Sequence, residues 1–104
     1  MAGIGGDGRE QLRATVHGLV QGVGFRWHVV RLSARLGLVG WVANRPDGSV
    51  EIVAEGPRQS LDLLEADLRR GPPGAMVDRV EVQRGPASGS FPAFAARSGS
   101  HPGD

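Results

Sequence analysis

The segment GLVQGVGFR, residues 18–26, ends in an arginine and contains no acid, thiol or hydroxyl group. Any chemistry in this segment must therefore come from backbone N–H groups acting together with the Arg26 guanidinium. A guanidinium fork meets two oxygens of a phosphoryl group at once, and successive N–H groups of a glycine-rich loop can surround an anion. These residues predict a binding site for an oxyanion.

The flanking sequence predicts that this segment joins the end of a strand to the start of a helix. Residues 11–18 alternate between apolar and polar side chains, as a half-buried strand does. From Phe25 the period changes, and Val29, Leu32 and Leu36 follow at helical spacing before a glycine. Unpaired N–H groups and the positive end of a helix dipole should therefore meet at residues 21–26.

The remaining sequence predicts a hairpin, a second helix and another strand. Two extended runs, residues 38–44 and 49–56, are joined by the turn sequence RPDG. A helical pattern then ends at GPPG, residues 71–74, and residues 76–84 alternate again. The element order is strand, helix, strand, strand, helix, strand. It indicates an α+β fold, the ferredoxin-like split βαβ sandwich, whose antiparallel sheet carries both helices on one face.

The length of the chain allows one domain. A chain of 104 residues cannot bury two independent cores. We expect the domain to span residues 10–98, between disordered tails at residues 1–9 and 99–104, which are rich in glycine and have little to bury.

Composition excludes several classes of mechanism. The chain has no cysteine, and all 12 of its basic residues are arginine, so thiolate and lysine chemistry are both excluded. The net charge of +1 favours neither nucleic acid nor a membrane surface as a partner. No apolar run is long enough to span a membrane, and the first residues do not resemble a secretory signal, so we expect a cytoplasmic protein.

Two motifs make the chain similar to the acylphosphatase family over roughly residues 10–84. The first is GxVQGVxFR after an aliphatic residue, met by Val16, Gly18, Val20, Gln21, Gly22, Val23, Phe25 and Arg26. The second is G-aromatic-V-x-N followed by spaced glycine and valine positions, met by Gly40, Trp41, Val42, Asn44, Gly48, Val50 and Gly56. Two independent motifs at the family's separation are specific, whereas a lone glycine-rich loop is usually only a turn.

The resemblance implies a hydrolase that cleaves small acyl phosphates to a carboxylate and inorganic phosphate, without metal or other cofactor. It implies that Arg26 binds the phosphoryl group and that Asn44 positions the attacking water. The phosphate would also meet the backbone amides of Gln21, Gly22, Val23, Gly24 and Phe25. A carboxamide cannot take a proton at neutral pH, so Asn44 would orient the water without being its base. The substrate's own phosphate oxygen would take the proton.

Some alternatives stay open from sequence alone. The loop could bind phosphate or an acyl phosphate without catalysis, as an accessory domain. RNA binding in the manner of an RNA recognition motif is disfavoured, because the expected central strands lack aromatic stacking residues.

The family's last strand has the form F-x-aliphatic-R-aromatic, but residues 94–98 read FAARS, so the fifth strand is undecided. A monomer is the simplest expectation for this size.

Other polar and aromatic residues are expected to have structural roles. Phe25 and Trp41 are expected in the core. The histidines His17, His28 and His101 lack metal-like spacing. Two i,i+4 ion pairs are expected on the second helix, Arg58 with Asp62 and Glu65 with Arg69. The carboxylates expected on solvated faces are Glu51, Glu55, Asp62 and Glu65.

Overall fold

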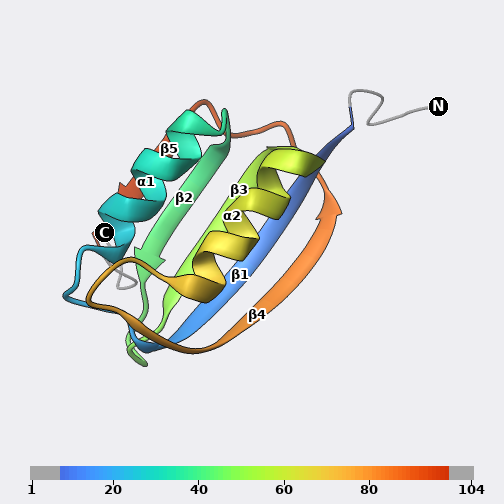
Figure 1. Ribbon diagram of the computed structural model, residues 1–104. Helices are drawn as coiled ribbons and strands as arrows, with labels where there is room; N and C mark the ends of the chain where they lie inside the picture. Colours follow the sequence, from blue (N-terminus) through green and yellow to red (C-terminus); the bar gives the residue numbers. More distant parts are fainter. Residues whose placement is uncertain (1–7, 99–104) are drawn as a thin grey trace.

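The computed structural model describes residues 8–98, and its elements follow the predicted order (Figure 1). The elements are β1 (Arg9–Leu19), α1 (Phe25–Arg35), β2 (Val39–Asn44), β3 (Val50–Pro57), α2 (Arg58–Arg70), β4 (Met76–Pro86) and β5 (Phe94–Arg97). Of the tails expected at residues 1–9 and 99–104, residues 1–7 and 99–104 lie outside the described residues, and Arg9, expected in the first tail, is instead the first residue of β1. None of the helices within residues 8–98 is long and apolar enough to cross a membrane.

The sheet has the strand order β4-β1-β3-β2-β5, and α1 and α2 cover the same face of it (Figure 1). The pairs formed by β1, β2, β3 and β4 are antiparallel, as predicted, and the ferredoxin-like fold is confirmed. The fifth strand, undecided from sequence, forms and runs parallel to β2, so the complete sheet is mixed. Its alanines are weak strand formers, but main-chain pairing with β2 and the packing of Phe94 on the core hold it in place.

The core lies between the helices and the sheet face that they cover. The alternating apolar residues of β1 and β3 point into it, together with one face of each helix. Fully buried members are Leu12, Ala14, Val16, Val29, Val42, Val50, Ile52, Ala54, Leu61, Leu64 and Leu68. Burial of each such leucine contributes ~1.5–3 kcal/mol, so this packed layer is the main source of stability and gives the loop before α1 a rigid base.

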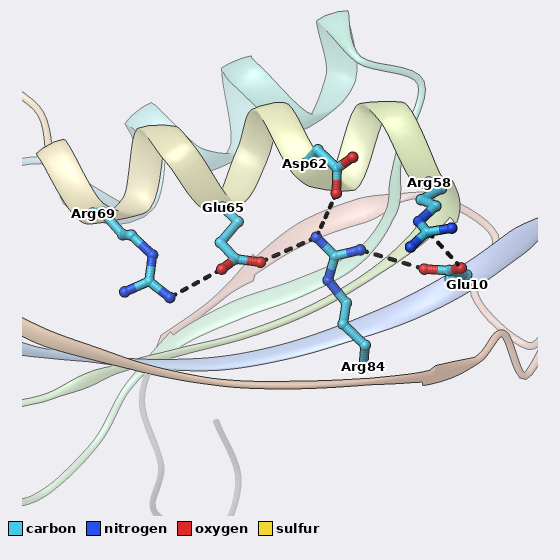
Figure 2. Close-up of polar contacts among 6 residues, drawn as sticks. All are labelled: Glu10, Arg58, Asp62, Glu65, Arg69 and Arg84. Atoms are coloured by element: carbon cyan, nitrogen blue, oxygen red, sulfur yellow. Dashed lines mark hydrogen bonds and ion pairs between the residues drawn. The ribbon is translucent and has the colours of Figure 1, made fainter.

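One of the two ion pairs expected on α2 is wrong. Glu65 pairs with Arg69 at 2.9 Å as predicted. Asp62, however, accepts a hydrogen bond from Arg84 of β4 at 2.9 Å, and Arg58 instead lies 4.0 Å from Glu10 (Figure 2). The Arg84 side chain is 27% exposed, so its attraction to carboxylates is screened less than that of the exposed Arg58.

Two expectations about burial are also wrong. Trp41 is only half-buried and lies outside the core, beneath the guanidinium of Arg97. Glu55 is 1% exposed instead of solvated, because the segment between β4 and β5 covers it. Strand alternation places Glu55 on the sheet face away from the helices, and sequence periodicity cannot show that a distant loop covers that face.

Candidate active site

A pocket of about 180 Å³ lies where the loop after β1, the first turn of α1 and the end of β2 meet. The residues that line it are Val20, Gly22, Gly24, Phe25, Arg26, Trp27 and Asn44. The two motifs, separate in the sequence, therefore contribute to one cavity. Its size suits a phosphoryl group with part of an attached substituent.

The loop backbone leaves a row of N–H groups without partners. Gly22 and Gly24 have φ values of 77° and 79°, in the left-handed region that favours glycine. Gly24 is also the N-cap of α1 and provides no side-chain cap. Within residues 8–98, none of the N–H groups of residues 21–27 donates a hydrogen bond, and the helix pattern starts with His28 N–H to the Gly24 carbonyl. A row of free N–H donors at a helix N-terminus is suited to binding an anion.

Gln21 connects this loop to the turn that follows β2. Its Nε2 donates to the carbonyl oxygens of Arg45 at 2.8 Å and Ser49 at 2.9 Å. Those residues close the hairpin turn, in which the Arg45 N–H donates to the Ser49 carbonyl at 2.9 Å. The Gln21 side chain thereby fixes the loop against the chain that immediately follows Asn44.

The same turn is fixed by Asp47, whose carboxylate accepts from both the hydroxyl and the N–H of Ser49. These hydrogen bonds, with the hydroxyl contributing most, hold the pKa of Asp47 below its ordinary value. The position of Asn44 therefore depends on the local turn as well as on strand pairing.

Arg26 is held by the last residue of β5. Its Nη1 donates to the Arg97 carbonyl oxygen at 2.6 Å. The guanidinium of Arg97 in turn lies 4.5 Å from the centre of the Trp41 ring, a cation–π contact that fixes the end of the strand. A guanidinium has several N–H donors, so Arg26 keeps donors for the pocket after this bond is made.

Asn44 is the last residue of β2 and pairs in register with Val50 of β3. Its side chain is half-buried, and its carboxamide makes no hydrogen bond to any other group in residues 8–98. A carboxamide placed at the wall of a pocket in this way has both an acceptor and donors available for a water molecule or a substrate oxygen.

The structure brings together most of the residues that the sequence analysis selected. Gly22, Gly24, Phe25, Arg26 and Asn44 line the pocket. Gln21 and Val23 are not lining residues, since Gln21 binds the hairpin turn and Val23 packs against the core.

The sequence analysis missed two lining residues, Val20 and Trp27. Val20 is 1% exposed and Trp27 is 65% exposed. Val20 belongs to the first motif but was not selected as a site residue, and Trp27 directly follows Arg26, so membership of the motif and adjacency to it were the signals that could have indicated them.

No cluster of three or more potential metal-ligating side chains occurs among residues 8–98. His17 and His28 instead pair with Glu81 and Asp67, and His101 lies outside the described residues. A second and larger pocket, about 420 Å³, is lined by Glu10, Arg58 and Arg84 among others, but there the opposite charges pair with each other. The charges of that larger pocket therefore satisfy one another, whereas Arg26 and Asn44 keep hydrogen-bonding groups available for a ligand.

Comparisons of the sequence and of the fold with known proteins give one consistent result. The acylphosphatase family model matches residues 12–96. An acylphosphatase of Rhodococcus jostii is 47% identical over 88 residues, covering 85% of this chain and 99% of the relative. An acylphosphatase of Koribacter versatilis is 54% identical over 74 residues, covering 71% of this chain and 67% of the relative. The crystal structure of the acylphosphatase from Bacillus subtilis matches with a TM-score of 0.81 and 38% identity, covering 85% of this chain and 98% of that one.

Proposed function

The chain belongs to the acylphosphatase family and is an acyl phosphate hydrolase, and on this basis we propose that the pocket at Arg26 and Asn44 is its active site. The observation that carries the proposal is the convergence of Arg26, Asn44 and the unpartnered N–H groups on one cavity. The substrate is a small acyl phosphate, and one product, inorganic phosphate, should bind to the same donors.

Binding of the phosphoryl group comes first. The N–H groups of residues 21–25 and the free donors of Arg26 surround its equatorial oxygens, where charge is concentrated in the transition state. The positive end of the α1 dipole adds to this attraction. The chain meets the charge of the phosphoryl group with fixed dipoles and one cation, and we propose that no metal ion takes part.

Hydrolysis then needs a water molecule in line with the bond that breaks. We propose that the Asn44 carboxamide holds this water. The water oxygen forms a bond to phosphorus as the bond from phosphorus to the acyl oxygen breaks, and the electron pair leaves with the carboxylate. One proton stays on the attacking oxygen and the other passes to a phosphoryl oxygen. The products are a carboxylate and dihydrogen phosphate, and the leaving group needs no acid because a carboxylate is already stable.

The test is release of phosphate from acetyl phosphate and from benzoyl phosphate, measured with chelator present. We expect Arg26→Ala to lower turnover by ~10³-fold or more without unfolding the protein, by comparison with arginines in other phosphoryl transfers. Arg31→Ala is the matched control, since Arg31 is an exposed arginine of the same helix and does not line the pocket. Near-normal turnover in folded Arg26→Ala protein would contradict the assignment.

A second arm separates catalysis from binding alone. Inorganic phosphate should inhibit the wild-type enzyme competitively, and Asn44→Ala should lower kcat more than it weakens inhibition by phosphate. A wild-type protein that binds phosphate but releases none from an acyl phosphate would instead be an accessory domain.

A further inference from the structure

The segment that joins β4 to β5, residues 87–93, must cross most of the sheet. β4 and β5 lie at opposite edges, with β1, β3 and β2 between them (Figure 1). Four strand spacings are about 19 Å, and the eight residue steps from Pro86 to Phe94 reach at most about 27 Å when extended. The crossing segment therefore has little slack, and its path strongly affects where β5 lies.

Glu55 holds this segment at the middle strand of the sheet. Its carboxylate accepts hydrogen bonds from Ser88 N–H at 2.8 Å, Ser88 Oγ at 2.7 Å, Gly89 N–H at 3.0 Å and Gln11 Nε2 at 2.7 Å. The residue is 1% exposed, and no arginine or histidine within residues 8–98 forms an ion pair with it. A buried carboxylate without a cation is costly unless it is fully hydrogen-bonded, so Glu55 and the crossing segment each need the other in place.

The crossing segment leads directly to the contact that holds Arg26. Beyond Gly89, the Ala93 carbonyl accepts from Gly40 N–H at 2.9 Å, and the strand then pairs with β2. At its end the Arg97 carbonyl accepts from Arg26 at 2.6 Å. This bond requires β5 to pair with β2 in the correct register.

Glu55 cannot reach the substrate itself. In the register of β3 with β2 it is opposite Val39, at the start of β2, whereas Asn44 is at the other end. Five residues of strand separate those ends by about 16 Å. Any effect of Glu55 on the reaction must therefore pass through the main chain.

We infer that Glu55 is a positioning residue for acyl phosphate hydrolysis, which acts by fixing Ser88 and Gly89 so that the Arg97 carbonyl orients Arg26 toward the pocket. The inference rests on the proposed role of Arg26. It assigns a positioning role to a carboxylate on the face of the sheet away from the helices, at a position that neither family motif specifies.

The test compares Glu55→Gln with Glu65→Gln. A glutamine keeps the shape of the side chain, but Ser88 N–H and Gly89 N–H donate to different oxygens of Glu55, and the NH₂ group that replaces one oxygen cannot accept, so one of the two bonds is lost. Glu65 is a suitable control because it also accepts two hydrogen bonds, from Arg69 and Arg84, on α2. We expect kcat/KM to fall on the order of 10–100-fold in Glu55→Gln, as for a small misplacement of a catalytic group, and to stay near wild type in Glu65→Gln.

A double-mutant cycle distinguishes positioning from a general loss of stability. If Glu55 acts through Arg26, adding Glu55→Gln to Arg26→Ala should change kcat/KM by no more than about twofold, because residues that share one interaction are not additive. A purely structural role would multiply the loss equally in both backgrounds. That result, or unchanged kcat/KM in folded Glu55→Gln, would overturn the inference.

Hydrogen exchange of the β5 amides provides a readout that does not depend on activity. Glu55→Gln should speed exchange of the β5 amides relative to those of β1. This result does not depend on whether the protein hydrolyses acyl phosphates, and unchanged exchange in β5 would overturn the inference. If Glu55→Gln does not fold, Ser88→Ala takes its place, because it removes the hydroxyl donor and keeps the N–H bond. It should lower kcat/KM several-fold and also speed exchange in β5, and normal values for both would count against the inference.

Discussion

At the scale of single residues, the site depends on backbone conformation as much as on side chains. Gly22 and Gly24 lie in the left-handed region, yet a Cβ built on either would meet no atom within 4 Å. The requirement for glycine is therefore conformational and not steric. The conformation leaves the N–H groups of the loop without partners among residues 8–98, next to the pocket that Gly22 and Gly24 line.

Gly24→Ala tests this reading. If the alanine keeps the left-handed conformation, the free energy of unfolding should fall by ~1–2 kcal/mol. If the loop relaxes instead, stability is largely kept but inhibition by inorganic phosphate weakens. Urea unfolding and the inhibition constant together separate the two cases. Gly85→Ala is the control, since Gly85 has no left-handed φ and a Cβ there meets no atom; equal behaviour of the two variants would refute the conformational argument.

At the scale of elements, α1 and the hairpin were predictable from local sequence. The helical spacing of apolar residues from Phe25 and the turn residues Pro46 and Gly48 predict the conformation of the chain within a few residues of themselves. In the structure α1 begins at Phe25. Gly48 has a φ of 92°, and its N–H donates to the Arg45 carbonyl. The motifs also selected Arg26 and Asn44, which line one pocket.

β5 and the burial of Glu55 were not predictable in the same way. The alanines of β5 carry little strand propensity, and the strand forms because β2 offers an edge and Arg97 stacks on Trp41. Glu55 occupies an outward position of an alternating strand, and only the path of a later segment buries it. Both features depend on contacts between residues far apart in the sequence, and the periodicity of apolar residues carries no information about such contacts.

Arg97→Met separates the two roles of the last residue of β5. The variant loses the cation–π contact with Trp41, which at this exposed site is worth ~0.5–1 kcal/mol of stability. The carbonyl that accepts from Arg26 remains, so kcat should stay within a few-fold of wild type. Urea unfolding and a phosphate-release assay measure the two effects. A loss of activity as large as that of Arg26→Ala would mean that the side chain, and not the carbonyl, is essential.

At the scale of the whole molecule, Arg84 links three elements. From β4 it donates to Glu10 of β1 at 3.3 Å and to Asp62 and Glu65 of α2 at 2.9 and 3.0 Å (Figure 2). Burial disfavours the charge of Arg84, but its hydrogen bonds to Asp62 and Glu65 outweigh this effect and raise the pKa of Arg84 above its ordinary value. The network ties the edge strand β4 to the helix layer, away from the pocket.

Arg84→Met should therefore lower stability but leave catalysis intact. Loss of three partly screened ion pairs predicts a decrease of ~1–2 kcal/mol in the free energy of unfolding. The difference from wild type should shrink at high salt, because screening weakens the pairs that only the wild type has. Urea unfolding at low and high salt measures this, with KM for an acyl phosphate as the check on the site. An increased KM would show that the network reaches the pocket.

The response of the whole fold to acid follows from its carboxylates. Burial of Glu55 favours the protonated acid, but hydrogen bonds from Ser88, Gln11 and Gly89 outweigh it, so its pKa lies below the ordinary value of 4.5. Burial also opposes the charge of Glu65, and its bonds from Arg69 and Arg84 lower the pKa in the same way. In the window between 4.5 and these lowered values the unfolded chain binds more protons than the folded one. The contribution of these two carboxylates to stability is therefore fully present above the window and is lost as pH falls through it.

Glu55→Gln removes one of these groups, and its effect should appear in the slope with pH as well as in absolute stability. Near neutral pH the variant is the less stable protein, because glutamine cannot accept from both N–H groups of the crossing segment. Below the ordinary pKa of 4.5 the wild type should lose up to ~1.4 kcal/mol more per pH unit than the variant, so the two unfolding free energies converge in acid. Urea unfolding across the acid range measures both slopes. Parallel slopes would mean that protonating Glu55 does not weaken the hold on the crossing segment, and that the buried carboxylate contributes through its shape alone.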